Sequence, residues 1–270
     1  CEADDLLAGE ELELEVEEID LSDIESMLAD EDDAEAELPV VEDEGIEVET
    51  EELDLTDKQA VIDFALKENP SIIINCAAYT AVDKAEEEPE KAFLLNRDVP
   101  AYLAEAAENV NAIIIHISTD YVFDGTANSP IKESDATNPQ SVYGRSKLAG
   151  EEAVMKYPEN LVVRTSWLYS AHGHNFLKTM LRLGKERDEI GVVSDQFGSP
   201  TSAAYLADAL LEISKQLMEG KKDAGGIYHY SHEGRCTWYD FAKAIMETAN
   251  LNCQVNFLTT EQYPTPAKRP

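Results

Sequence analysis

Three short apolar runs recur through the middle of the chain, and helical periodicity separates them. The runs cover 71–75, 112–118 and 161–164. Their apolar residues are consecutive rather than alternating, which is typical of strands buried on both faces of a parallel sheet. The intervening stretches predict helices over 57–69, 84–108 and 143–156, and Thr56 and Asp57 can cap the first of these. The pattern therefore predicts a doubly wound α/β fold built on a parallel sheet.

Beyond residue 164 the pattern becomes less regular. Helical periodicity is expected near 175–187, 203–219 and 238–249, and short apolar segments predict strands at 191–193 and 227–229. We therefore expect two structured parts. One is a sheet-forming domain over 46–168, and the other is a smaller part over 169–270 that is interleaved with it.

Charge divides the chain at a different place. Of the 56 acidic residues, 23 fall within the first 50 positions, and the first basic residue is Lys58. The net charge of −35 therefore consists of −23 in the first 50 residues and −12 in the remaining 220. A stretch this acidic has too few apolar groups to offset the conformational entropy that is lost on ordering it. We therefore predict that residues 1–45 form a mobile, solvated segment.

Composition also excludes several classes of partner and location. A strongly anionic protein is repelled by nucleic acid and by anionic lipid surfaces. No apolar run reaches the roughly 18 residues needed to span a bilayer. The four cysteines, Cys1, Cys76, Cys236 and Cys253, include no CxxC pair, so we expect reduced thiols in a cytoplasmic protein.

Candidate chemistry lies at the end of the second apolar run and in the helix that follows. Thr119 ends that run, and Tyr143 and Lys147 are four residues apart in SVYGRSKLAGE. Residues at i and i+4 share one face of a helix, so the ammonium is expected to favour the phenolate. A tyrosine tuned in this way can exchange a proton with a substrate oxygen that Thr119 holds, while a nicotinamide supplies hydride.

The segments around these residues resemble one family. NCAAYTAVDKAEEEPEKAFLLN, STDYVFDG, NPQSVYGRSKLAGE, VVRTSWLYSAHGHNFLKTMLRL and VVSDQFGSPTSAAYLAD are similar to the dTDP-4-dehydrorhamnose reductases, extended short-chain dehydrogenase/reductases with a Rossmann-like domain. The resemblance covers about 46–270. It implies NADPH-dependent reduction of a nucleotide sugar in dTDP-L-rhamnose synthesis for cell-wall polysaccharide, with NADH as the alternative cofactor, and it is compatible with a homodimer. Some members of this family hold Mg²⁺, but no ligands for it are recognisable here.

The resemblance also implies roles for individual residues. Thr119, Tyr143 and Lys147 would be catalytic, and Tyr143 and Lys147 would also contact the cofactor. Asn75, Ala77 and Ala78 would lie along the cofactor, and Asn96 would support the backbone of the site. The residues expected on the substrate side are Tyr121 and Trp167 beside the sugar, and Asn175, Lys178 and Gln196 toward the nucleotide diphosphate.

One family feature is missing from the printed sequence. The family holds the cofactor pyrophosphate in an N-terminal glycine-rich turn, yet Gly9 and Gly45 are the only glycines before Gly125. We therefore expect weak NADPH binding by the chain as printed. Two alternatives stay open: a non-catalytic binding or regulatory homologue, or another epimerase or dehydratase of the superfamily. A zinc site at His172 and His174 is disfavoured because HGHN lacks a third ligand.

Overall fold

The computed structural model describes residues 53–220 and 224–270. The predictions that concern the acidic segment over 1–45, and the start of the sheet-forming domain at residue 46, lie outside the described residues.

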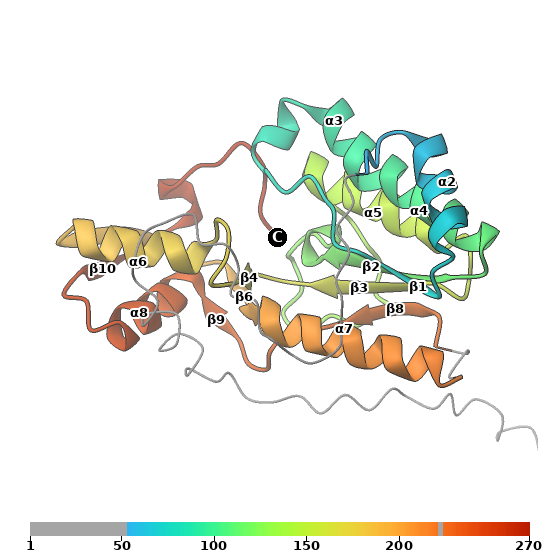
Figure 1. The fold of residues 1–270 in the computed structure, drawn as a ribbon. Coiled ribbons are helices and arrows are strands. Elements are labelled where there is room, and N and C mark those ends of the chain that lie inside the picture. Colours follow the sequence, from blue (N-terminus) through green and yellow to red (C-terminus); the bar gives the residue numbers. More distant parts are fainter. Residues whose placement is uncertain (1–52, 221–223) are drawn as a thin grey trace, which may run out of the picture.

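A four-stranded parallel sheet forms the centre of the molecule (Figure 1). Its order is β1-β2-β3-β8, in which β1 is Ile72–Asn75, β2 is Ile113–Thr119, β3 is Leu161–Thr165 and β8 is Gly226–His229. Each of the three apolar runs has become one strand, and neighbouring strands pair in parallel throughout. The expected parallel sheet is therefore confirmed, and all four strands end at the same edge.

Helices cover both faces of this sheet, as Figure 1 shows. On one face α2 (Lys58–Glu68), α4 (Val99–Asn109) and the end of α5 (Val142–Val154) share a core with Ile114 and Val162. On the other face α7 (Ala203–Met218) packs through leucines and Ile213 against Ile115, Leu161 and Val163. Successive residues of a strand point to opposite faces, which explains why adjacent isoleucines enter different cores. The doubly wound α/β fold is confirmed.

The single long helix expected over 84–108 is wrong. The chain instead forms η1 (Lys84–Glu86), α3 (Pro89–Phe93), a π-helical turn η2 (Leu94–Asp98) and then α4. Pro89 lacks a backbone N–H and stands at the start of α3, where no partner for that group is required. The π turn carries the fully buried Asn96, and turns of this kind are frequent at functional sites.

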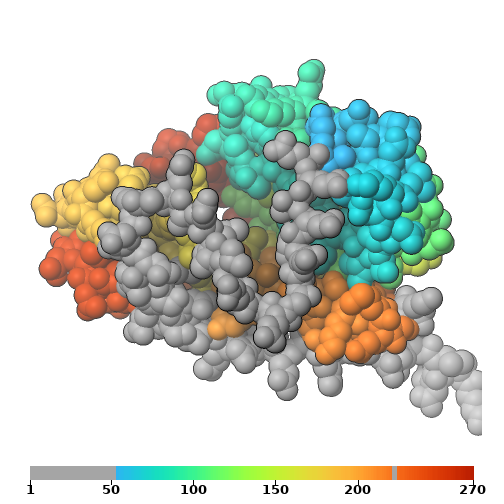
Figure 2. All heavy atoms as spheres, in the orientation of Figure 1, coloured from blue at the N-terminus to red at the C-terminus, as the bar shows by residue number. Residues whose placement is uncertain are grey.

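The rest of the chain forms a smaller part beside the sheet, seen as the yellow and red-orange spheres at the left of Figure 2. Here β5 (Glu189–Val193) pairs in parallel with β10 (Gln254–Leu258), and α6 (Phe176–Glu186) and α8 (Trp238–Thr248) share a core with them. Two short pairs complete it: β4 (Leu168–Tyr169) with β7 (Thr201–Ser202), and β6 (Phe197–Gly198) with β9 (Cys236–Thr237). The 3-10 turn η4 (Thr260–Gln262) follows β10. The segment 203–229 returns to the main domain, since β8 is a strand of the central sheet and α7 packs on its face.

Candidate active site

Thr119 and Tyr143 meet at the carboxyl edge of the sheet. Thr119 is the last residue of β2, and Tyr143 lies in the first turn of α5, which Ser141 caps by accepting a hydrogen bond from the Gly144 N–H. The Thr119 hydroxyl approaches the Tyr143 hydroxyl closely enough to favour its phenolate form. Burial raises the pKa of Tyr143 above its ordinary value of 10, and the Thr119 hydrogen bond opposes that shift only in part. Tyr143 therefore holds its proton at neutral pH.

Lys147 lies one helical turn further along and is buried. Its Nζ donates to the Ile117 carbonyl oxygen at 2.6 Å and lies 3.5 Å from Nε2 of His116. Burial lowers the pKa of Lys147 to about 8, and Glu151 and Cys76 partly offset this. The sequence predicts that Lys147 favours the phenolate form of Tyr143. In the structure burial dominates instead, and it raises the pKa of Tyr143.

A segment of small side chains, residues 76–78, follows the end of β1. Cys76 and Ala77 are exposed, and Ala78 is half-buried. The buried Asn75 orients this segment, since its Oδ1 accepts a hydrogen bond from the Ala77 N–H at 3.1 Å. Its Nδ2 lies 2.9 Å from Nδ1 of His116. Burial and Lys147 both keep the pKa of His116 well below its ordinary value, so this imidazole is neutral.

Asn96 ties the segment after β1 to the helix that carries Tyr143. Its Oδ1 accepts from the Tyr79 N–H at 2.7 Å, and its Nδ2 donates to the Tyr79 carbonyl at 3.0 Å and to Ser146 Oγ at 2.9 Å. Ser146 in turn donates to the Tyr143 carbonyl at 2.8 Å. Asn96 thus holds the backbone around the tyrosine in position.

Tyr121 and Trp167 stand at the ends of β2 and β3. The Tyr121 ring meets that of Tyr143 edge-on at 5.3 Å between centroids, and burial raises its pKa to about 12. Trp167 has a left-handed backbone with φ of 49° and stacks face to face on Trp238 at 3.5 Å. A bulky residue in that conformation is costly, and such strain clusters at functional sites. Sequence reasoning missed Trp238, whose signal was the aromatic pair that opens the helix in TWYDFA.

Asn175, Lys178 and Gln196 occupy the smaller part. Asn175 caps α6 by accepting from the Lys178 N–H at 3.1 Å and donates to the Ser170 carbonyl at 2.7 Å. The Lys178 ammonium donates to the Ala171 carbonyl at 2.9 Å, and Gln196 donates to Thr260 Oγ1 at 3.1 Å. These contacts order the loops of the smaller part, and none of them involves Thr119, Tyr143 or Lys147.

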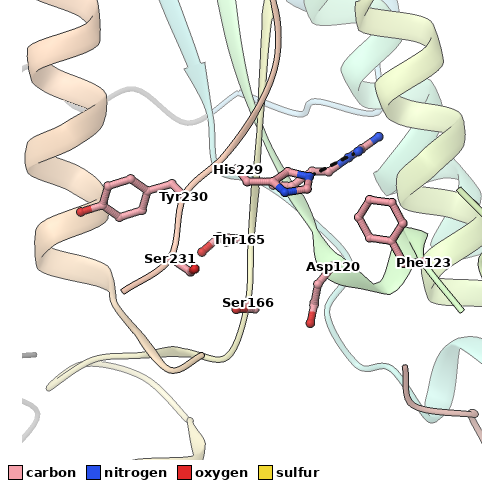
Figure 3. A pocket seen from close by; sticks show the side chains of 8 residues that line it. Asp120, Phe123, Thr165, Ser166, His229, Tyr230 and Ser231 are labelled. Atoms are coloured by element: carbon pink, nitrogen blue, oxygen red, sulfur yellow. Dashed lines mark hydrogen bonds between the residues drawn. The ribbon is translucent and has the colours of Figure 1, made fainter. Parts of the chain in front are cut away.

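A small cavity of about 80 Å³ opens beside Thr119 (Figure 3). The segments that follow β2, β3 and β8 line it, through Asp120, Phe123, Arg164, Thr165, Ser166, His229, Tyr230 and Ser231. Behind it the buried Arg164 forms an ion pair with the buried Glu151 of α5 at 2.7 Å, and Glu151 also accepts from Ser118. The sequence signal for this network was Glu151 itself, which repeats the four-residue spacing of Tyr143 and Lys147.

Two further classes of site are not found within residues 53–220 and 224–270. No group of three or more histidine, cysteine or acidic side chains is placed to hold a metal ion there. Nor does that part of the chain contain a helix long and apolar enough for a bilayer span.

Comparison with known proteins places this site in context. The RmlD substrate-binding domain matches residues 35–270. A dTDP-4-dehydrorhamnose reductase from Escherichia coli is 49% identical over 209 residues, which is 74% of this chain and 69% of that protein. The crystal structure of the reductase from Clostridium acetobutylicum has a TM-score of 0.77 at 47% identity and covers 81% of this chain and 76% of its own. The reductase from Bacillus anthracis in complex with NADP has a TM-score of 0.75 at 43% identity, with the same coverage.

Proposed function

Because this chain belongs to the RmlD family of dTDP-4-dehydrorhamnose reductases, we propose that it reduces dTDP-4-dehydro-6-deoxy-L-mannose to dTDP-L-rhamnose with NADPH. The observation that carries the proposal is the approach of the Thr119 hydroxyl to a protonated, partly buried Tyr143 at the carboxyl edge of a parallel sheet. In such sheets, ligands bind outside the carboxyl ends of the strands.

The residues at that edge fit the nicotinamide half of the cofactor. Exposed Cys76 and Ala77 leave room for a ribose to approach the backbone. The Lys147 ammonium has three donors, and its contacts with Ile117 and His116 leave capacity for a ribose hydroxyl. Asn75, Ala77 and Ala78, together with Tyr143 and Lys147, are the residues we assign to this half of the site.

The chemistry follows from the state of the tyrosine. NADPH supplies the hydride that goes to the keto carbon of the sugar. Thr119 orients the keto oxygen by donating a hydrogen bond to it, and Tyr143 then gives its proton to that oxygen as charge develops there. A tyrosine with a raised pKa holds this proton until the oxygen becomes basic enough to take it. Tyr121 and Trp167 pack against the sugar, while Asn175, Lys178 and Gln196 face the nucleotide diphosphate.

The family and the free cysteines also support a location. Cys76, Cys236 and Cys253 are unbridged within the described residues, as expected of a cytoplasmic enzyme. We assign it to the cytoplasm, where dTDP-sugars are made.

The direct test is to mix the purified chain with NADPH and dTDP-4-dehydro-6-deoxy-L-mannose and to follow the loss of NADPH absorbance. Because the glycine-rich turn is missing and NADPH binding is expected to be weak, NADPH is supplied in large excess; formation of dTDP-L-rhamnose, identified by mass spectrometry, is then the expected result. A parallel calorimetric titration with NADPH alone separates failure to bind the cofactor from failure of the chemistry. Binding of NADPH without reduction of the sugar would favour a non-catalytic homologue.

A further inference from the structure

Thr119 bonds to a second acidic group besides Tyr143. Its Oγ1 lies 3.1 Å from Oδ1 of Asp120 in hydrogen-bonding geometry. A hydroxyl carries one proton and two acceptor lone pairs, so Thr119 can donate to either neighbour while it accepts from the other. Tyr143, Thr119 and Asp120 thus form a continuous chain of three oxygen acids that can run in either direction.

Asp120 is placed to connect this chain with solvent. Asp120 lines the cavity of about 80 Å³ together with Ser166 and Ser231, and all three are labelled in Figure 3. A cavity of this size whose lining includes several polar side chains can hold water, which needs only two to four polar partners. Asp120 therefore has the Thr119 hydroxyl as a hydrogen-bond partner and lines a space large enough for water.

Within residues 53–220 and 224–270, the charges around Asp120 leave its carboxyl without an ion-pair partner of its own. Across the cavity, Arg164 of β3 is already paired with Glu151 of α5, and its Nη1 lies 3.5 Å from His229 of β8. Burial lowers the pKa of His229, so this imidazole is largely uncharged at neutral pH. The remaining titratable neighbours, Tyr121 and Tyr143, are neutral phenols because burial raises the pKa of each. Burial likewise raises the pKa of Asp120 to about 6, against the lowering effect of the Thr119 hydrogen bond.

We propose that Asp120 supplies the proton that restores Tyr143 after each turnover, through the hydroxyl of Thr119. The inference rests on the proposed function, in which Tyr143 gives its proton to the sugar oxygen and is left as a phenolate. The Thr119 O–H proton then moves to the phenolate oxygen, and Thr119 Oγ1 takes the carboxyl proton of Asp120. The products are a neutral tyrosine, a neutral threonine and an Asp120 carboxylate. Water in the cavity returns a proton to that carboxylate, and no electrons move.

The direction of transfer follows from the acidities of the two ends. The pKa of Asp120 is about 6, whereas that of Tyr143 lies above 10, so a proton passes from the carboxylic acid to the phenolate spontaneously. Lys147 is less suited to this task in the ligand-free chain, because its ammonium is bound to the Ile117 carbonyl and faces His116.

The kinetic test compares Asp120→Asn with the parent chain under rapid mixing. The amide keeps the size of the side chain but holds no transferable acidic proton. Tyr143 begins each experiment protonated, so we expect the first turnover of the variant to stay fast, with one NADPH oxidised per site. Later turnovers should be slower by about 10-fold or more. In the parent chain their rate should fall as the pH rises through about 6, and the variant should lack this dependence.

Asp124→Asn is the matched control. It makes the same change of charge four residues away, at a carboxyl whose pKa is about 2 because Thr126 and Asn138 donate to it. This carboxyl holds no proton at neutral pH, so the control should follow the parent kinetics. Equal slowing of the first and later turnovers in Asp120→Asn would mean a structural role and would overturn the proposal. Parent-like later turnovers would overturn it too.

A second readout does not depend on turnover. We would label the aspartates with ¹³C at the carboxyl carbon and assign the Asp120 signal as the one lost in Asp120→Asn. Its NMR titration should have a midpoint near 6, and Thr119→Val should raise that midpoint because the threonine hydrogen bond is lost. A midpoint near the ordinary value of 3.8, or one unaffected by Thr119→Val, refutes the relay. If the parent chain oxidises no NADPH in the presence of the sugar, the proposed function fails, and this titration still decides the relay.

Discussion

At the scale of single residues, Tyr143 carries the transferable proton, and its removal should affect the rate rather than binding. In Tyr143→Phe the ring and its packing against Tyr121 remain, but the acid is lost. We expect the rate of sugar reduction to fall by about 100-fold or more, with little change in NADPH affinity. Stopped-flow absorbance measures the first quantity and calorimetry the second. Tyr102→Phe, on α4, is the control, and near-normal turnover in Tyr143→Phe would remove the tyrosine from the chemistry.

Lys147 predicts a dependence of stability on pH. The pKa of its ammonium falls from 10.5 to about 8 on folding, so between these values the unfolded chain binds more protons than the folded chain. The free energy of unfolding should therefore rise with pH in this window, by at most ~1.4 kcal/mol for each pH unit. Below about pH 8 the ammonium is charged in both states and adds no slope.

Urea unfolding between about pH 8 and pH 9.5 measures this slope, and Lys147→Met should abolish it. Both chains should carry Cys76→Ser, because Lys147 lowers the pKa of that thiol and its titration would otherwise differ between them. Identical slopes in the two chains would mean that Lys147 keeps an ordinary pKa in the folded state.

The sequence could place these residues but could not predict their charge states. The i, i+4 spacing and the strand ending put Thr119, Tyr143 and Lys147 in one region, and the structure brings Thr119 and Tyr143 into contact. The direction of the Tyr143 shift depends on burial by residues distant in sequence, and periodicity carries no such information. Asp120 was not predicted as a site residue for the same reason. Its proposed role depends on its partial burial beside a cavity, which the sequence STD does not reveal.

At the scale of elements, the joint between α5 and β3 depends on one buried ion pair. Glu151 and Arg164 are 2% and 4% exposed, and three contacts of 3.2 Å or less join them. A lone buried charge is costly, whereas the intact pair roughly offsets its own desolvation. The pair therefore fixes how the helix that bears Tyr143 sits on the sheet.

Glu151→Gln should lower the free energy of unfolding by ~3–5 kcal/mol, because Arg164 is left buried without its counter-charge. Equilibrium urea unfolding measures the loss. Glu186→Gln provides the matched control, since Glu186 pairs with Arg182 on the exposed face of α6 and its loss should cost under ~1 kcal/mol. Equal losses of unfolding free energy in the two variants would show that the buried pair contributes no more to stability than the exposed pair.

The elements themselves were predictable where one physical signal dominated. Consecutive apolar residues specified β1, β2 and β3, and Asp57 caps α2 by accepting from the Gln59 and Ala60 N–H groups. The break between α3 and α4 was missed because the residues of η2 are ones that also occur in α-helices. Its π geometry places Asn96 where its side chain accepts a hydrogen bond from the Tyr79 N–H, and the sequence does not show this contact. Pairings of two residues, such as β4 with β7, are too short to leave a periodic pattern.

At the scale of the whole molecule, the last described residues connect the two parts of the chain beside the candidate site. Both Arg269 guanidinium nitrogens Nη1 and Nη2 donate to the Asp83 carboxylate at 2.7 Å, and the Ala267 N–H donates to the same group at 3.1 Å. Pro270 lies so close to Gly125 that a β-carbon there would come within 2.2 Å of its backbone. This segment thus packs against the loop that carries Tyr121 and leads from β2 to α5.

Arg269→Ala should loosen this connection while leaving the fold intact. The pair is partly exposed, with side-chain exposures of 21% and 41%, so we expect a loss of global stability of only ~1 kcal/mol. Local opening should respond more, because a segment can exchange without global unfolding. Hydrogen exchange in 120–125 and 264–270 should speed up by about 10-fold, which corresponds to ~1.4 kcal/mol. The KM for the sugar nucleotide should rise with kcat kept, since Tyr121 would be held less firmly. Asp83→Asn should reproduce both effects, and Arg182→Ala should cause neither. Unchanged hydrogen exchange in both segments would show that the Arg269–Asp83 pair does not hold the last residues against the loop that carries Tyr121.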